Sequence, residues 1–300
     1  MIQHTEGYRI ATKATWVGLG TNFVLGTFKV AAGILGNSWA VIADGMHTVS
    51  DILSSLGAMV GLVIARRAPD GTHPYGHGKA EVLAARFVSL VLLVVGALIL
   101  LEAGDRLFNP HKIEKPPGQI ALWAALVSII VKEALYQYKA YFARKTKSSV
   151  LHAEAWHHRS DAISSIPVLL GVAGAIFLGE KMHWLDPIAA ALVGVIILSI
   201  ALRMSYTTLG ELMDAAPPRD VIEGVRQLAS AVPGVLGVEK IRCRKAGLDY
   251  LCDVHIEVDP KMPVDRAHEI ARAVQEHLVR DGDNILQALV HIEPFYPGDH

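Results

Sequence analysis

Residues 44–51, DGMHTVSD, lie within an otherwise mostly apolar run from Trp39 to Ala65. The run is long enough to cross a bilayer as a helix, yet this stretch holds three ionisable side chains, Asp44, His47 and Asp51. Residues four positions apart share a face of a helix, so His47 and Asp51 point the same way. Insertion scales put the cost of one such residue in a membrane at roughly 2.5 to 3.5 kcal/mol, which favours a functional role.

The same spacing recurs in a later apolar segment, where HHRSD places His157 and Asp161 four positions apart. Together the two helices could offer two imidazoles and two carboxylates to one point, a set that suits Zn²⁺, Co²⁺ or Cd²⁺. A structural hydrogen bond could explain one His-Asp pair, whereas two copies in separate spans favour a metal site. At about 1.5 Å per residue, Asp51 lies about 20 Å and Asp161 roughly 30 Å from the outer ends of their helices. We therefore expect staggered or tilted helices if the pairs meet.

Six segments have the length and composition of membrane-spanning helices. The chain of 300 residues is 52% hydrophobic and only 19% charged, which points to a membrane protein. The formal net charge of −1 gives no reason to expect a nucleic-acid partner. The polar N-terminus lacks the order of a cleaved signal peptide, so we expect the first span to remain in the mature protein. The spans are expected at 14–36, 38–66, 81–107, 118–143, 149–178 and 185–209.

Basic residues in the connecting segments predict the orientation of the spans. The larger set would be cytoplasmic together with both termini, and the smaller set would lie on the other side of the membrane, which we expect to be a bacterial inner membrane. The larger set is Arg9, Lys13, Arg66, Arg67, Lys79, Lys139, Arg144, Lys145 and Lys147; the smaller is Arg106, Lys112, Lys115 and Lys181.

The sequence becomes more polar after MDAAPPRD, which predicts a second domain. We expect a membrane domain over residues 1–213 and a small cytoplasmic α+β domain over 214–300, with the element order αββαβ and both helices on one face of a three-stranded sheet. The two cysteines, Cys243 and Cys252, lack a CxxC spacing and indicate neither a disulfide framework nor a thiolate zinc site. We expect them to be small residues of the core.

Two further groups of residues could bind metal. In the loop APDGTHPYGHGKAE, Asp70, His73 and His77 stand close together, and Pro74 and Gly76 favour a tight loop over a helix. In the second domain, His255, His291 and Glu293 point away from the core by strand parity, and His268 lies in a helix. Taken singly such histidines are more often solvated; as a set they predict a site at a subunit interface.

The motifs ADGMHTVSD, HPYGHGKAE and HHRSD, in that order over six spans with an αββαβ tail, resemble the cation diffusion facilitator family of metal transporters. The resemblance covers essentially the whole chain. It implies a homodimeric divalent-metal/proton antiporter, with no cofactor and no enzymatic activity, that exports metal from the cytoplasm. The implied transport site is His47, Asp51, His157 and Asp161; the loop site is Asp70, His73 and His77; the tail site is His255, His268, His291 and Glu293, with Glu239 a further ligand.

Departures from the family pattern leave alternatives open. Members often have His where Glu239 stands and Asp where Glu293 stands, which affects the number of ions in the tail site. The His-Asp quartet resembles the zinc-type members, so we expect Zn²⁺, with Fe²⁺, Co²⁺ and Cd²⁺ as further substrates; a manganese- or iron-selective exporter is the alternative. A passive channel could use the same ligands. An intramembrane metalloprotease should carry HExxH, which this sequence lacks.

Other polar residues of the spans also have expected roles. Lys79 and Asp214, at the cytoplasmic ends of the spans, would pair and anchor a hinge. Further residues would line the bundle interior or pair with one another: Asn22, Lys29, Asp44, Lys132 and Glu133. Among these, Asp44 is the residue to test for a role in the outward pathway.

Overall fold

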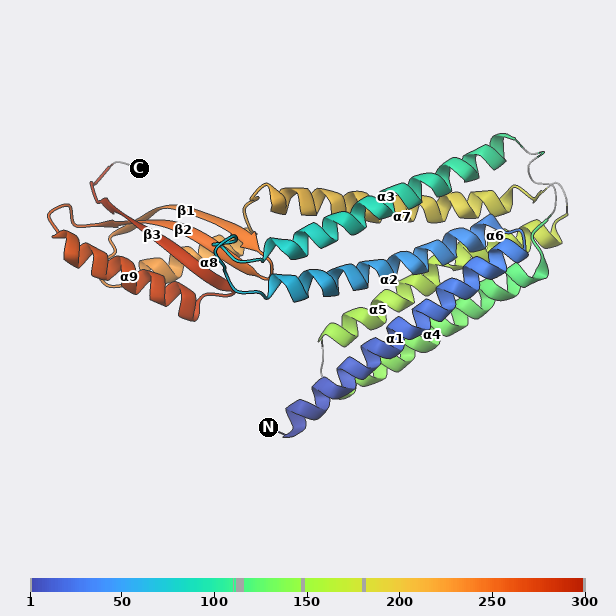
Figure 1. The fold of residues 1–300 in the computed structure, drawn as a ribbon, viewed down its shortest axis with the longest axis horizontal. Helices are drawn as coiled ribbons and strands as arrows, with labels where there is room; N and C mark the ends of the chain where they lie inside the picture. The colour runs from blue at the N-terminus through green and yellow to red at the C-terminus, as the bar shows by residue number, and fades with distance from the viewer. Residues whose placement is uncertain (1, 110, 112–115, 147–148, 180–181, 299–300) are drawn as a thin grey trace. The chain divides into compact units, whose positions relative to one another are not determined.

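The computed structural model describes residues 2–109, 111, 116–146, 149–179 and 182–298 (Figure 1). Of the basic residues used to predict orientation, Lys112, Lys115, Lys147 and Lys181 lie outside the described residues. The chain divides into two compact units, one of Met1–Leu56 and Val88–Arg203 and the other of Gly57–Phe87 and Met204–His300. The predicted domain division at 213/214 stays a prediction.

The helical elements match the six expected spans. In chain order they are α1 (Ile2–Leu35), α2 (Trp39–Ala65), α3 (Lys79–Phe108), α4 (Gln119–Thr146), α5 (Ser149–Ser164), α6 (Ile166–Phe177) and α7 (Leu185–Leu212). Six stretches of these helices, α5 and α6 counting together, are long and apolar enough to cross a membrane. Large apolar side chains such as Phe23, Leu101 and Phe177 are exposed on the bundle, as is expected of residues that face lipid.

The fifth span is two helices, where the sequence analysis expected a single helix over 149–178. The interruption falls at Ser165, between α5 and α6, and Pro167 lies in the first turn of α6. Proline has no N–H to continue the helical ladder, and its ring clashes with the carbonyl four residues earlier, which explains the break. The hydroxyl of Ser165 donates to the carbonyl oxygen of Asp161 at 3.0 Å. The break therefore lies one turn from a predicted metal ligand.

Glycines bring α1 and α2 into close contact. A Cβ on Gly33 would lie 2.8 Å from the backbone nitrogen of Ile42, and a Cβ on Gly45 would lie 2.9 Å from that of Val30. Membrane helices have no hydrophobic drive to associate with each other, so small residues that permit backbone contact favour their packing. Since Gly45 lies beside Asp44, this contact fixes the part of α2 that leads into the DGMHTVSD stretch.

Asp186 of α7 holds the start of α2. Its Oδ1 accepts from the Ser38 hydroxyl at 2.5 Å, and its Oδ2 accepts from the Trp39 backbone N–H at 2.7 Å. The first N–H groups of a helix lack partners within the helix, and a carboxylate there is favoured by the helix dipole as well. A residue distant in sequence thereby caps the helix that carries His47 and Asp51.

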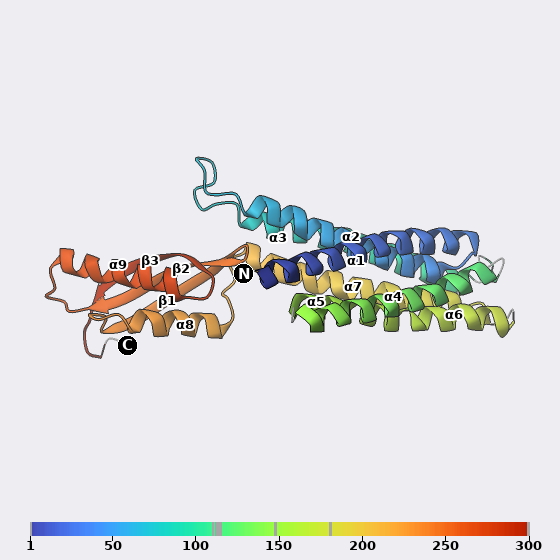
Figure 2. The same cartoon turned by 90° about the horizontal axis from the view of Figure 1, so that it is seen from below.

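The C-terminal part of the second unit is the expected αββαβ fold. Its elements are α8 (Arg219–Ser230), β1 (Gly237–Ala246), β2 (Asp249–Val258), α9 (Val264–Asp281) and β3 (Ile285–Pro294). The sheet order is β1-β2-β3; β1 pairs with β2 antiparallel, and β2 pairs with β3 parallel. Both helices cover one face of the sheet (Figure 2). The buried core there includes Val225, Val274 and Leu278 of the helices and Val254 and Ile256 of β2. The other face is free to present polar residues.

The cysteines correct one expectation. Cys243 and Cys252 are buried in the core, as expected, but they face each other in the β1–β2 register and are joined by a disulfide. The register follows from the two-residue turn at Gly247 and Leu248, in which Gly247 has a positive φ of 73°. Hairpin turns of two residues fix which strand residues lie opposite, so the pairing follows from the turn and not from a CxxC spacing.

The segment around residues 66–79 packs on this domain within the second unit. A Cβ on Gly78 would lie 2.6 Å from the carbonyl oxygen of Ala246, so the backbones approach closely there. The expected pair of Lys79 and Asp214 is confirmed, with Nζ 2.8 Å from Oδ1, and Arg244 Nη1 lies 3.1 Å from Oδ2 of the same carboxylate. The hydrogen bond from Lys79 lowers the pKa of Asp214, so this carboxylate stays charged at neutral pH.

We predict that Asp186→Ala lowers the free energy of unfolding by about 0.5 to 2 kcal/mol, the usual range for the loss of a helix N-cap. Asp186→Asn keeps one acceptor oxygen and should lose less. The measurement is unfolding of the detergent-solubilised protein by titration with sodium dodecyl sulfate. An Asp186→Ala variant as stable as the wild type would contradict a role for Asp186 in holding α2.

Candidate metal centres

The predicted transport quartet meets inside the helical unit. His47 and Asp51 come from α2, and His157 and Asp161 come from α5. His47 Nε2 lies 3.9 Å from Asp161 Oδ1, and His157 Nε2 lies 3.9 Å from Asp51 Oδ1 and 3.8 Å from Asp161 Oδ2. Each helix thus contacts the other through an imidazole and a carboxylate, which agrees with the expectation that all four side chains converge.

These separations are close to those of a metal cage. Ligands about 2.1 Å from a tetrahedral ion lie roughly 3.4 Å from one another. Candidate ligand atoms of His47, Asp51 and Asp161 already lie within 4.8 Å of one another. His47 and Asp161 are buried, whereas the His157 side chain is 56% exposed. The ligand atoms are therefore slightly farther apart than a bound ion would require, and His157 lies on the open side of the group.

A lysine that the sequence analysis placed only in the bundle interior takes part in this site. Lys132 of α4 is buried, and its Nζ lies 2.6 Å from Asp161 Oδ2 and 3.8 Å from Asp51 Oδ2. The sequence of α4 alone does not show which residues Lys132 contacts, because its partners lie on α2 and α5. In the described structure the two carboxylates of the quartet share this ammonium group.

Asp44 does not join the quartet. Its Oδ2 lies 2.8 Å from Lys29 Nζ, and its Oδ1 accepts from the Ser165 hydroxyl at 3.0 Å. The expected pairing of the interior residues thus holds for Lys29 and Asp44. Because Ser165 stands at the α5–α6 break, Asp44 ties α2 to the point where the fifth span is interrupted.

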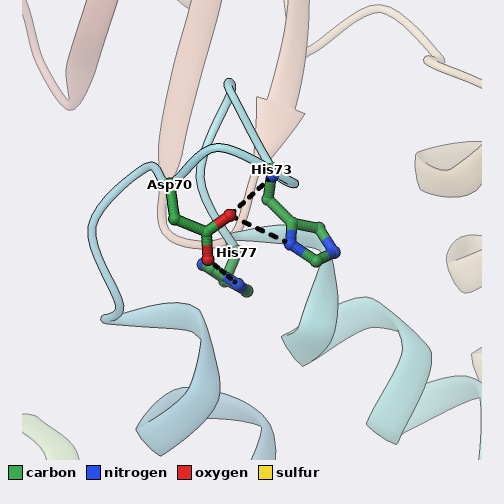
Figure 3. Close-up of side chains that lie close together, drawn as sticks. All are labelled: Asp70, His73 and His77. Carbon is green, nitrogen blue, oxygen red and sulfur yellow. Dashed lines mark hydrogen bonds and ion pairs between the residues drawn. The ribbon is translucent and has the colours of Figure 1, made fainter.

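The loop residues Asp70, His73 and His77 come together as predicted (Figure 3). Asp70 Oδ1 lies 3.5 Å from His73 Nδ1, Asp70 Oδ2 lies 3.4 Å from His77 Nε2, and the two imidazole centroids are 4.4 Å apart. The turn that allows this includes Gly76, which has a φ of 82° and donates its N–H to the His73 carbonyl at 2.9 Å. A side chain would strain that backbone.

The Asp70 carboxylate is held in its charged form. Oδ1 accepts from the Thr72 hydroxyl at 2.7 Å and from the backbone N–H groups of His73 at 2.7 Å and Thr72 at 2.8 Å. These hydrogen bonds, that from the Thr72 hydroxyl first, hold the pKa of Asp70 far below its usual range. Thr72 was not singled out from the sequence, although a threonine two residues after an aspartate is a common turn signal.

Three of the predicted tail ligands gather on the open face of the sheet. His255 and His291 face each other in the parallel β2–β3 register, with ring centroids 4.9 Å apart. Glu293 Oε1 lies 2.5 Å from His255 Nδ1 and 3.7 Å from His291 Nε2. Glu239 lies in a bulge of β1, and a hydrogen bond between the Glu239 and Glu293 carboxyl groups, followed by one from His255, lowers the pKa of Glu293. Glu239 therefore lies beside this group, and its role as a ligand, which the resemblance implied, stays a prediction.

His268 is not brought to this group within one chain. It is exposed on α9, beside the buried Ala267, and α9 covers the opposite face of the sheet. A role for His268 in the tail site therefore requires a second chain. Glu257, which the sequence analysis did not name, is buried on β2 and stands in register with Glu293.

Comparisons with known proteins agree on one family. The family model described as "Cation efflux transmembrane domain" matches residues 15–213, and "Cation efflux protein, cytoplasmic domain" matches residues 217–295. The "Manganese efflux system protein MneP" of Bacillus subtilis is 31% identical over 97% of this chain and 99% of its own length. The "Metal tolerance protein C1" of Arabidopsis thaliana is 37% identical over 93% of this chain and 62% of its own.

A third relative is a magnetosome protein. The "Magnetosome protein MamM" of Magnetospirillum gryphiswaldense is 37% identical over 87% of this chain and 81% of its own. A structure of the MamM CTD is 36% identical, with a TM-score of 0.25, and covers 26% of this chain and 98% of that one.

We predict that Asp70→Asn weakens metal binding by the loop by the same factor at every pH from 5 to 8. The pKa of Asp70 is lowered, so the carboxylate is ionised at every pH from 5 to 8. The stability that this ionised form gives the loop is fully present above the unfolded pKa of about 3.9, and it is lost only as the pH falls through the lowered pKa. Losing an outer-shell partner alone typically weakens metal binding roughly 10- to 100-fold, so losing a ligand should cost at least about tenfold.

The measurement is Zn²⁺ titration of the full-length protein at several pH values, with Asp283→Asn as a control carboxylate outside the loop. The quantity compared is the dissociation constant of the variant divided by that of the wild type. If this ratio falls toward one between pH 8 and pH 5, Asp70 itself titrates in that range, and the prediction is contradicted.

Proposed function

Because the chain belongs to the cation efflux family of divalent-metal transporters, we propose that it exports Zn²⁺ from the cytoplasm in exchange for protons. The observation that carries the proposal is the convergence of two His-Asp pairs from α2 and α5 on one point inside the membrane-spanning unit. The chain is a multi-pass membrane protein, and the proposed orientation puts both termini, the loop of Asp70 and the tail on the cytoplasmic side.

The ligand set supports zinc as the substrate. Two imidazole nitrogens and two carboxylate oxygens suit Zn²⁺ and also Co²⁺, Cd²⁺ and Fe²⁺, whereas Mg²⁺ and Ca²⁺ prefer shells of oxygen alone. Manganese is the second candidate, because a relative that aligns with nearly the whole chain is named a manganese efflux protein. The proposed site is therefore a divalent-metal site whose order of preference a transport assay must rank.

Proton exchange follows from the chemistry of the ligands. An imidazole binds metal through a neutral nitrogen, so a protonated His47 or His157 must release its proton when metal enters. If α2 and α5 move together against the rest of the bundle, the quartet takes metal from the cytoplasm and releases it outside, then returns with protons. A closed four-ligand site argues against a passive channel, since tight coordination slows release.

The tail is proposed to sense cytoplasmic metal. Its ligands His255, His291, Glu293 and Glu239 lie on the open face of the sheet, and His268 would reach a metal only from a second chain. Metal shared between two tails would favour one arrangement of a homodimer and so couple the metal concentration to transport.

The first test reconstitutes the purified protein in liposomes that hold a pH dye and a metal dye. Zn²⁺, Mn²⁺ or Fe²⁺ is added outside with and without a proton gradient. We expect metal uptake accompanied by proton movement in the opposite direction, with Zn²⁺ the fastest. Metal uptake that ignores the proton gradient would contradict antiport and leave a channel or a uniporter.

The same assay tests the quartet. We expect His47→Ala with Asp51→Ala to abolish both metal uptake and proton movement, because half of the ligands are gone. His152→Ala with Glu102→Ala removes a histidine and a carboxylate of the same bundle that do not face the site, and should keep transport. Metal transport that survives loss of His47 and Asp51 would remove the quartet from the mechanism.

The tail is tested with His255→Ala combined with His291→Ala in the full-length chain. Under the sensing proposal the concentration of Zn²⁺ that gives half-maximal transport rises, because the metal no longer stabilises the active arrangement. His277→Ala, which removes a histidine of α9 paired with Asp281, is the control. Unchanged metal dependence with only a weaker dimer would show that the tail merely holds the dimer together.

A further inference from the structure

Lys132 contacts both carboxylates of the proposed metal cage. Its ammonium group touches Asp161 Oδ2 at 2.6 Å and lies 3.8 Å from Asp51 Oδ2, and its side chain is only 1% exposed. His47 and His157 approach the same two carboxylates. The ammonium group and the imidazoles therefore surround the same pair of carboxylates.

The bond from Lys132 to Asp161 uses a ligand atom of the proposed cage. An oxygen that accepts from an ammonium group at 2.6 Å has that lone pair engaged, and a divalent ion bound to the same carboxylates would lie within a few ångströms of the ammonium charge. Like charges at that distance in a poorly screened interior repel strongly. Metal and ammonium therefore compete for the two carboxylates.

The other buried lysines of the bundle do not share this arrangement. Lys29 pairs with Asp44 at 2.8 Å, and Lys139, seven residues after Lys132 on α4, pairs with Glu154 at 2.7 Å. In each pair one cation faces a carboxylate outside the quartet. Lys132 alone among these three is shared by two proposed metal ligands.

We propose that Lys132 is a tethered competitor of the transported metal: its ammonium group fills the empty site, and metal binds only by displacing it from Asp51 and Asp161. This rests on the proposed transport function of the quartet and adds a residue that sets its affinity. Two consequences follow. The competitor weakens metal binding, which eases release. The ammonium group also neutralises part of the negative charge of the carboxylates while the metal-free site turns back from the outside to the cytoplasmic side. A buried charge without a partner is strongly unfavourable.

Two variants of Lys132 should act in opposite directions. Lys132→Met removes the ammonium charge at similar size, so we expect Zn²⁺ to bind roughly tenfold tighter, within the usual range of coupling between two bound species. Lys132→Arg offers a planar fork that can hold both carboxylates, so we expect weaker Zn²⁺ binding and a higher KM. Lys139→Met, a buried lysine lost from the same face of the same helix, should leave Zn²⁺ affinity within about twofold, since its partner lies elsewhere.

Binding is measured by calorimetry on the full-length protein in detergent. A background of Asp70→Asn, His255→Ala and His291→Ala weakens the other candidate sites, so that the quartet dominates the titration. In liposomes, Lys132→Met should slow net Zn²⁺ uptake but leave the exchange of Zn²⁺ for isotopic Zn²⁺ at its wild-type rate, because exchange never requires the empty site to return.

Zn²⁺ affinity of Lys132→Met equal to or below that of the wild type would overturn the proposal, as would equal losses of net uptake and exchange. If Lys132→Met does not assemble, the arginine variant decides alone: a Zn²⁺ affinity that does not fall contradicts the idea. The two proposals fail differently. Uptake that survives His47→Ala with Asp51→Ala removes the transport site itself, whereas wild-type behaviour of the Lys132 variants removes only the competitor.

Discussion

Two negatively charged carboxylates inside an apolar bundle require positive charges or hydrogen-bond donors beside them. The arrangement of the helical unit follows from that requirement. Asp51 and Asp161 would each destabilise a lone membrane helix by a few kcal/mol. Brought together by α2 and α5, they share the Lys132 ammonium group from α4 and lie next to the imidazoles of His47 and His157. Three helices are thereby tied to one point, and the polar residues that make the bundle costly are those that specify its packing.

The same requirement orders the rest of the interior. On α2, Asp44 lies two turns before Asp51 and is matched by Lys29; on α4, Lys139 lies two turns after Lys132 and is matched by Glu154. Each of these flanking pairs holds one positive and one negative charge. The central group holds two carboxylates for one lysine, so it is the place in this series where a further positive charge is favoured.

Much of this was predictable from local spacing. The HxxxD pairs follow from the helical period of 3.6, and the common face of His255, His291 and Glu293 follows from the strand period of 2. The grouping of the DGTHPYGH loop follows from its turn residues, and the structure brings the residues of all three groups together. The break at Ser165 could also have been foreseen, because Pro167 stands inside the expected helix. The disulfide follows from a two-residue turn that places Cys243 opposite Cys252, which a search for CxxC cannot find.

Other features depend on contacts between distant segments. A pattern on α4 tells which face is apolar but not which helix that face meets, so Lys132 could be placed in the interior but not between Asp51 and Asp161. The cap of α2 by Asp186 joins residues almost 150 positions apart and has no local signal. Burial of Glu257 and the position of Glu239 in a bulge likewise depend on how β1 lies against β2.

The parallel pairing of β2 with β3 has a consequence for how the tail folds. His255 and His291 are neighbours only after α9, which connects the two strands, has crossed over and packed on the sheet. Contacts between residues so far apart form late, because a long loop must be closed before they contribute. A metal ion that needed both imidazoles would therefore find its site only after the last strand is in place. Bound there, it would act by slowing the unfolding of the finished sheet.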